Sequence, residues 1–115
     1  MSIILDEKSK KMYCEALAEN LPVFRAKLGV SQEELANRIG LSRNMLACIE
    51  TKKKEMSWIT FVALALLFLK NENTAPIFKS LNIYDEELDN FLMFEQSALW
   101  VLTDSKYVIM IIIGQ

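Results

Sequence analysis

The stretch Gln32–Glu50, QEELANRIGLSRNMLACIE, decides the fold of this chain. Its apolar residues recur at the spacing of a helix that buries one face. The residues expected to point inward are Leu35, Ile39, Leu46 and Ile49. Ala36 falls where two helices would approach most closely, and Gly40 falls where the chain must turn, because positive φ is least costly at glycine. The stretch therefore predicts two short helices joined by a tight turn.

Serine residues mark the start of both helices. Ser31 and Ser42 each precede an apolar segment, where the hydroxyl can accept a hydrogen bond from a backbone N–H of the first turn. Glu34, three residues after Ser31, completes a capping box. Two capped helices around a glycine turn form the pattern of a helix-turn-helix, a motif that places its second helix in the major groove of DNA.

The wider run from Leu21 to Lys70 resembles the phage repressor and Cro-type (Xre-like) family of DNA-binding domains. The features that carry the resemblance are Phe24-Arg25, the segment LGVSQEELA at 28–36, Ile49-Glu50 and the apolar helix from Trp58. The resemblance implies a mainly α fold, a lambda-repressor-like helical bundle that contains the helix-turn-helix. It also implies that Arg25 and Glu50 form a buried or half-buried ion pair.

The chain departs from this family directly after Glu50. The family usually has an Asn-Gly pair at this point, whereas this chain has Thr51-Lys52. The exchange removes a residue that adopts positive φ easily. We therefore expect the second helix to end differently here.

The predicted DNA-binding domain, residues 21–70, follows an N-terminal helical extension, residues 1–20. Asp6-Glu7 can begin the extension, because acidic side chains favour the N-terminus of a helix. Pro22 has no backbone N–H, so we expect a break or kink near Asn20-Leu21. The helix that starts there should end at Gly29.

An apolar helix is predicted from Trp58 to Lys70, with Ser57 as its N-cap. The residues expected on its helical stripe are Ile59, Val62, Ala65, Leu66 and Leu69. Its other positions are also mostly apolar. A helix that is apolar nearly all round is buried or covered by a partner.

Residues 71–115 form an acidic and apolar C-terminal segment. Pro76 predicts a short helix over about 75–81, and Asp85 begins another helix. Beyond about residue 97, β-branched and aromatic residues indicate a possible short β strand or hairpin. The apolar run Tyr107–Ile113 must be covered, either by the domain's own core or by the same segment of a second subunit. We expect Trp100–Ile113 to hold a homodimer together.

The net charge of −2 hides an uneven distribution along the chain. From Arg25 to Lys54, seven basic residues stand against three acidic ones, which gives +4. From Asn71 to Gln115, two basic residues stand against seven acidic ones, which gives −5. The basic charge lies where the motif lies, as nucleic-acid binding requires. The acidic part should face away from phosphate.

Composition excludes other classes of function. With two cysteines and no histidine, the chain lacks the usual zinc spacings, and we expect neither a metal nor a cofactor. Cys14 should lie in the core, and a redox-sensing role for Cys48 stays open as the minor alternative. No glycine-rich phosphate loop and no paired nucleophile and base can be assembled, so we do not expect an enzyme. No apolar run approaches the roughly 20 residues that span a membrane, and no cleavable signal is visible, so we expect a cytoplasmic protein.

The resemblance places the first turns of the second helix against the base edges of DNA. The residues expected to contact bases are Arg43, Asn44, Ala47 and Cys48. Arginine can donate two hydrogen bonds to guanine, asparagine can pair with adenine, and small side chains can meet a thymine methyl group. The residues expected to contact the DNA backbone are Gln32, Ser42, Thr51, Lys52, Lys53 and Lys54. The alternative is that these side chains form an ordinary solvated surface.

These observations predict a sequence-specific DNA-binding transcriptional regulator, interpreted as a repressor. It would bind double-stranded DNA as a homodimer on a pseudo-palindromic site. The alternative is an antitoxin-like or regulatory partner protein, whose C-terminal segment binds another protein while its helices bind DNA.

Overall fold

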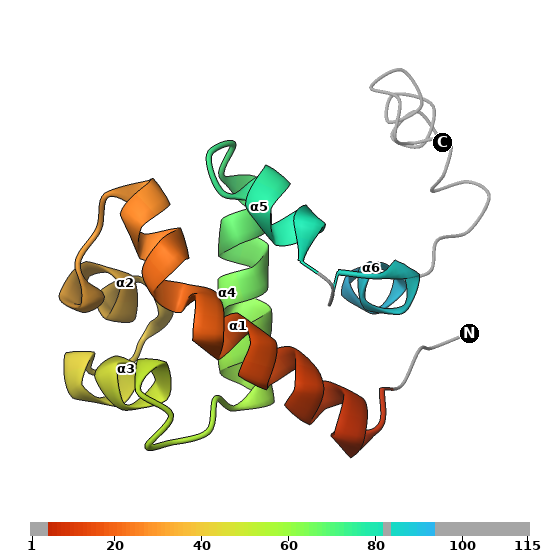
Figure 1. Cartoon of the computed structure of the whole chain (residues 1–115), viewed down its shortest axis with the longest axis horizontal. Coiled ribbons are helices and arrows are strands. Elements are labelled where there is room, and N and C mark those ends of the chain that lie inside the picture. The colour runs from red at the N-terminus through yellow and green to blue at the C-terminus, as the bar shows by residue number, and fades with distance from the viewer. Residues whose placement is uncertain (1–4, 82–83, 94–115) are drawn as a thin grey trace, which may run out of the picture.

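The computed structural model describes residues 5–81 and 84–93 of the chain. These residues form six helices and no strand, which confirms the prediction of a mainly helical protein (Figure 1). The helices are α1 (Glu7–Leu28), α2 (Gln32–Ile39), α3 (Arg43–Glu50), α4 (Trp58–Lys70), α5 (Ala75–Ser80) and α6 (Glu86–Leu92). The strand or hairpin expected beyond residue 97 lies outside the described residues.

Two long helices, α1 and α4, form the centre of the molecule. They pack against each other, with α2 and α3 side by side on one flank and α5 near the end of α4 (Figure 1). Between them, the rings of Phe24 and Phe68 stack with their centroids 4.3 Å apart. On the far side of this pair, α6 lies away from α3 (Figure 1). The acidic part of the described chain is thus separated from α3 by the core.

Helix α1 is continuous, and the break expected near Asn20-Leu21 is wrong. Pro22 lies inside the helix on its exposed side. The buried residues of α1 form one uninterrupted stripe and are Tyr13, Cys14, Leu17, Ala18, Leu21 and Phe24. A proline inside a helix costs about 3 kcal/mol, whereas each large apolar side chain buried along the stripe contributes about 1.5–3 kcal/mol. The burial outweighs the cost, so the expected boundary between residues 20 and 21 falls within a helix.

The ends of α1, α2 and α3 follow the capping residues of the sequence. Ser31 accepts from the backbone N–H of Glu34 at 3.1 Å, and the Glu34 carboxylate accepts from the N–H of Ser31 at 3.2 Å. This is the expected capping box. Ser42 accepts from the N–H of Met45 at 3.1 Å. Gly29 and Gly40 end their helices with φ of 71° and 80°, in the left-handed region that glycine adopts most easily.

Helix α4 begins after its expected cap, Ser57. Of the expected stripe, Ala65 is buried and Val62 and Leu69 pack against the core, but the prediction is wrong for Ile59 and Leu66. The buried residues of α4 are Thr60, Phe61, Leu64, Ala65 and Phe68. Ile59 is 82% exposed and Leu66 is 45% exposed, so both lie on the opposite side from the core. The helix is apolar nearly all round, and its periodicity therefore does not distinguish the buried side from the exposed one.

The short helices α5 and α6 are held against the core by specific contacts. Buried Thr74 donates from its hydroxyl to the carbonyl of Phe68 at 2.7 Å. The Tyr13 hydroxyl lies 3.1 Å from a carboxylate oxygen of Glu87 and 3.2 Å from one of Asp85, so it can donate to either. Among the described residues, no helix combines the length and apolar composition needed to cross a bilayer.

Candidate nucleic-acid interface

The residues expected to read bases lie along the outer side of α3. Arg43 and Asn44 are exposed in its first turn, and Ala47 and Cys48 are partly buried one turn later. The opposite side of α3 is anchored in the core, where Leu46 is fully buried. Among the described residues, neither Arg43 nor Asn44 makes a side-chain hydrogen bond or ion pair. Their polar groups are therefore available to a ligand.

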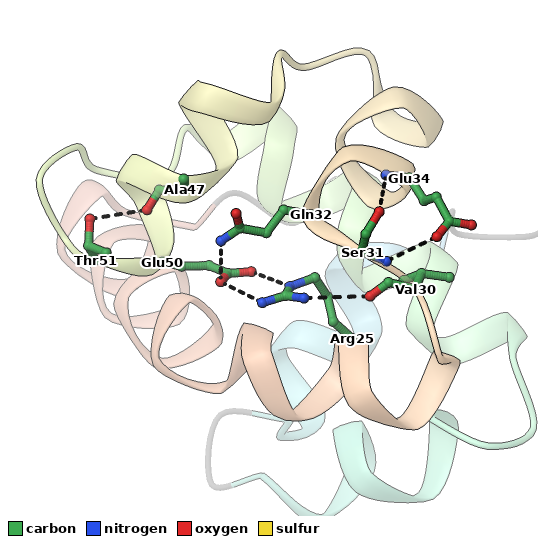
Figure 2. Close-up of polar contacts among 8 residues, drawn as sticks. All are labelled: Arg25, Val30, Ser31, Gln32, Glu34, Ala47, Glu50 and Thr51. Atoms are coloured by element: carbon green, nitrogen blue, oxygen red, sulfur yellow. Dashed lines mark hydrogen bonds and ion pairs between the residues drawn. The ribbon is translucent and has the colours of Figure 1, made fainter.

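The far end of α3 is fixed by a cluster of three polar side chains, Arg25, Gln32 and Glu50 (Figure 2). The Arg25 guanidinium donates to both carboxylate oxygens of Glu50, through Nε at 2.7 Å and Nη2 at 3.0 Å. The Gln32 amide donates to Glu50 Oε1 at 3.0 Å. The cluster thus ties the end of α1 and the start of α2 to the end of α3.

Burial and pairing act in opposite directions on the charge of Glu50. Its side chain is only 6% exposed, and burial alone would raise its pKa. The hydrogen bonds from Arg25 and Gln32, together with the positive charge of Arg25, outweigh burial and lower the pKa below its ordinary value. The hydrogen bond to Glu50 correspondingly raises the pKa of Arg25. Both residues are charged at neutral pH, and the implied ion pair is present.

The two hydroxyl groups expected to contact DNA differ in their free hydrogen-bonding capacity. Ser42 uses an oxygen lone pair to cap α3, which leaves its O–H free to donate to a phosphate. Thr51 donates its O–H to the carbonyl of Ala47 at 3.0 Å (Figure 2). A phosphate contact by the Thr51 hydroxyl would therefore have to replace a bond that ends the helix.

The lysines after α3 also differ from one another. Lys52 has φ of 65° and pairs with Glu19 on α1 at 2.5 Å. Lys53 and Lys54 are exposed, and within the described part of the chain they make no ion pair. The backbone N–H groups of Lys53 and Lys54 both donate to the carbonyl of Cys48. This loop therefore holds two lysine ammonium groups in solvent beside the end of α3.

Comparison with known proteins gives no match. No family model matches the chain, and neither a curated protein nor a solved structure shows significant similarity to it.

The two cysteines lie in different environments and are not joined by a disulfide. Cys14 is buried as expected, and burial raises the pKa of its thiol to about 11, so it is protonated at neutral pH. Cys48 is partly buried on α3. Within the described residues, no group of three or more histidine, cysteine, aspartate or glutamate side chains is placed to hold a metal.

Two features of the site were missed by the sequence analysis. One is the ion pair between Glu19 and Lys52, which are 33 positions apart, so no local pattern connects them. The other is the positive φ of Lys52, a residue whose side chain disfavours this conformation. The missing Asn-Gly pair led us to expect a different helix end, whereas Lys52 adopts the left-handed conformation that a glycine would adopt there. The sequence did not indicate that a lysine would itself adopt this conformation.

Proposed function

We propose that this protein is a sequence-specific DNA-binding transcriptional regulator of the phage repressor and Cro type. In this proposal α2, the turn at Gly40 and α3 form a helix-turn-helix, and α3 enters the major groove. The observation that carries it is the two-sided character of α3. Its inner side is anchored by Leu46, Ile49 and the Glu50 cluster, while Arg43 and Asn44 face solvent without a described partner.

The exposed side of α3 offers groups suited to base edges. The Arg43 guanidinium can donate two parallel hydrogen bonds to guanine, and the Asn44 amide can donate to and accept from adenine. Ala47 and Cys48 present little side chain beyond the first turn, which leaves room for a thymine methyl group. A helix that is anchored in the core and tied to two other helices at its end loses little conformational freedom when it binds.

The groups around α3 can hold the phosphate backbone. The Ser42 O–H, the second amide hydrogen of Gln32 and the ammonium groups of Lys53 and Lys54 are free to donate to phosphate oxygens. The Lys52 ammonium is already paired with Glu19, and Thr51 would have to leave the end of α3. The position of α6 away from α3 keeps its acidic side chains from the DNA (Figure 1).

A single recognition helix reads only a few base pairs, so we propose that two copies act together. A homodimer on a pseudo-palindromic site would place its two α3 helices about 34–36 Å apart, one turn of DNA. The charge distribution along the chain favours the side of α3 as the surface that meets DNA. Bound at a promoter, such a dimer would act as a repressor by blocking access.

The test is to select genomic fragments with the purified protein and to footprint those that are enriched. The proposal expects a short protected sequence with two-fold symmetry, and loss of its enrichment when Arg43 and Asn44 are both replaced by alanine. Replacement of Arg38 and Asn37, an exposed pair of the same side chains on α2, is the matched control and should leave the enrichment intact. Binding without any preferred sequence would contradict the proposal.

A further inference from the structure

The side of α4 that faces away from the core is an apolar surface. Ile59, Val62, Ala63 and Leu66, here called the α4 stripe, recur at i, i+3, i+4 and i+7, the spacing of one helix face. Ile59 is 82% exposed and Leu66 is 45% exposed. Ala63 and Val62 are partly buried between them, and Val62 also packs against the core at the edge of the stripe. The stripe contains no charged or hydroxyl side chain. Lys70, one turn after Leu66, is the first charged residue along this face.

The α4 stripe differs from the exposed face of an ordinary surface helix. A helix at the surface of a globular protein exposes polar residues opposite its buried face. On α4 the buried face is already supplied by Phe61, Leu64 and Phe68. Single exposed apolar residues are common, but two aligned on one helix face, with only apolar side chains between them, indicate a surface that another segment covers.

The described chain ends close to the start of this stripe. Phe91 on α6 packs edge-on against Trp58, with ring centroids 5.4 Å apart, and Trp58 directly precedes Ile59. The last described residue, Met93, follows Phe91 by two positions and is 57% exposed. The last described residue is therefore two positions from a contact with the N-terminal end of α4.

The remaining sequence contains a segment of matching composition and sufficient reach. Tyr107–Ile113 is an unbroken apolar run of seven residues. The thirteen residues from 94 to 106 can span up to about 45 Å when extended. The thirteen residues of α4 cover only about 20 Å along its axis. Every position of the stripe is within reach of the run.

We propose that residues 107–113 lie along the α4 stripe of their own chain. The contact would remove two apolar surfaces from water at once, the run and the stripe, which is the main driving force for such association. A segment tethered close to its site has an effective concentration in the millimolar range. A second copy at micromolar concentration would compete poorly with it. The two copies that meet on DNA would then contact each other through another surface.

The test uses the full-length protein with a photo-activated cross-linking amino acid in place of Ile111. After irradiation, intact mass and peptide mapping identify the product. The proposal expects a product of monomer mass in which position 111 is joined to the peptide that contains Ile59–Leu66. A product of dimer mass, or a cross-link to another part of the chain, would overturn it.

Surface variants then test whether the stripe itself makes the contact. Ile59→Ser with Leu66→Ser should abolish most of the cross-link, because both side chains would lose their apolar contact with the run. The matched control is Val23→Ser, at a residue of α1 that is 48% exposed and so comparable with Leu66. It should leave the cross-link unchanged. Equal yields from the stripe variant and the control would also overturn the proposal. Circular dichroism of both variants establishes that the helices are retained.

Discussion

The polar side chains on the two sides of α3 differ in whether they are bound to other groups of the protein. On the inner side, Arg25, Gln32 and Glu50 satisfy one another, and the Glu50 side chain is 6% exposed. On the outer side, Arg43 and Asn44 have no described partner and stand in solvent. A polar side chain bound within the protein is committed to the fold, and one left unbound is available to a ligand. Substitutions on the inner side should therefore change stability, and those on the outer side should change binding.

The largest expected effect is the loss of the buried ion pair. Glu50→Ala should lower the free energy of unfolding by about 3 kcal/mol, because it leaves the Arg25 guanidinium without its partner. This loss of stability is at the low end of the range for buried pairs, because the Arg25 side chain is 21% exposed. Urea denaturation measures the change. Arg25→Leu with Glu50→Leu should recover much of the loss, and a double variant no better than Glu50→Ala would contradict this account.

The same pair should make stability depend on pH in the acid range. The pKa of Glu50 is lowered in the folded protein relative to an ordinary value of 4.5. The unfolded chain therefore takes up the proton first as the pH falls. The stabilisation is fully present above pH 4.5 and is lost as the pH falls through the lower, folded pKa. A series of thermal melts should show this loss in the wild type, and Glu50→Gln should remove that component of the pH dependence.

On the outer side, Arg43→Ala should change binding and leave stability nearly unchanged. Loss of a bidentate contact with guanine costs about 1–3 kcal/mol at one position of the site. Affinity for random duplexes should stay close to that of the wild type. Titration of the preferred and a scrambled duplex measures both. Arg38→Ala, which removes the same charge from α2, is the control. Equal weakening on both duplexes would show that Arg43 contacts phosphate only.

The contrast between the two sides of α3 also shows what the sequence could predict. The helix ends were predictable, because Ser31, Ser42, Gly29 and Gly40 act through hydrogen bonds and backbone conformations within a few residues. The buried residues of α3, Leu46 and Ile49, followed from its apolar spacing. The Arg25–Glu50 pair was implied by the family resemblance, since nothing local connects residues 25 positions apart.

The errors came from long-range packing that outweighs local rules. Pro22 would end an isolated helix, but the buried stripe of α1 continues through it. On α4, Ile59 and Leu66 were wrongly expected on the stripe because the helix is apolar on both sides. The core buries Phe61 and Phe68 instead of Ile59. The contact of Tyr13 with Asp85 and Glu87 joins positions more than 70 residues apart. The dimer expected from Trp100–Ile113 is not one of these errors and stays a prediction, because these residues lie outside the described part of the chain.

A smaller effect is expected for the exposed lysines after α3. Lys53→Gln with Lys54→Gln should weaken binding to all duplexes alike, because phosphate contacts carry no sequence information. The slope of log affinity against log salt should decrease by about one unit for each true contact. The corresponding substitution of Lys79 on α5, an exposed lysine away from α3, is the control. An unchanged slope would mean that Lys53 and Lys54 are solvated in the complex.

The smallest effect concerns Lys52, where the two sides of α3 meet. Its backbone has φ of 65°, a conformation in which a side chain costs about 1–2 kcal/mol. Its ammonium pairs with Glu19, but these side chains are 51% and 59% exposed, so the pair contributes only about 0.2–1 kcal/mol.

Comparison of Lys52→Gly with Lys52→Ala separates the cost of the backbone conformation from the energy of the ion pair. Both variants lose the ammonium group, and only glycine removes the backbone strain. Urea denaturation should find the glycine variant more stable than the alanine variant by about 1 kcal/mol. Glu19→Gln, which removes the ion pair and leaves the backbone alone, should cost less than this difference and only at low salt. Equal stability of the glycine and alanine variants would contradict this account. It would show that the positive φ at position 52 does not destabilise the folded protein.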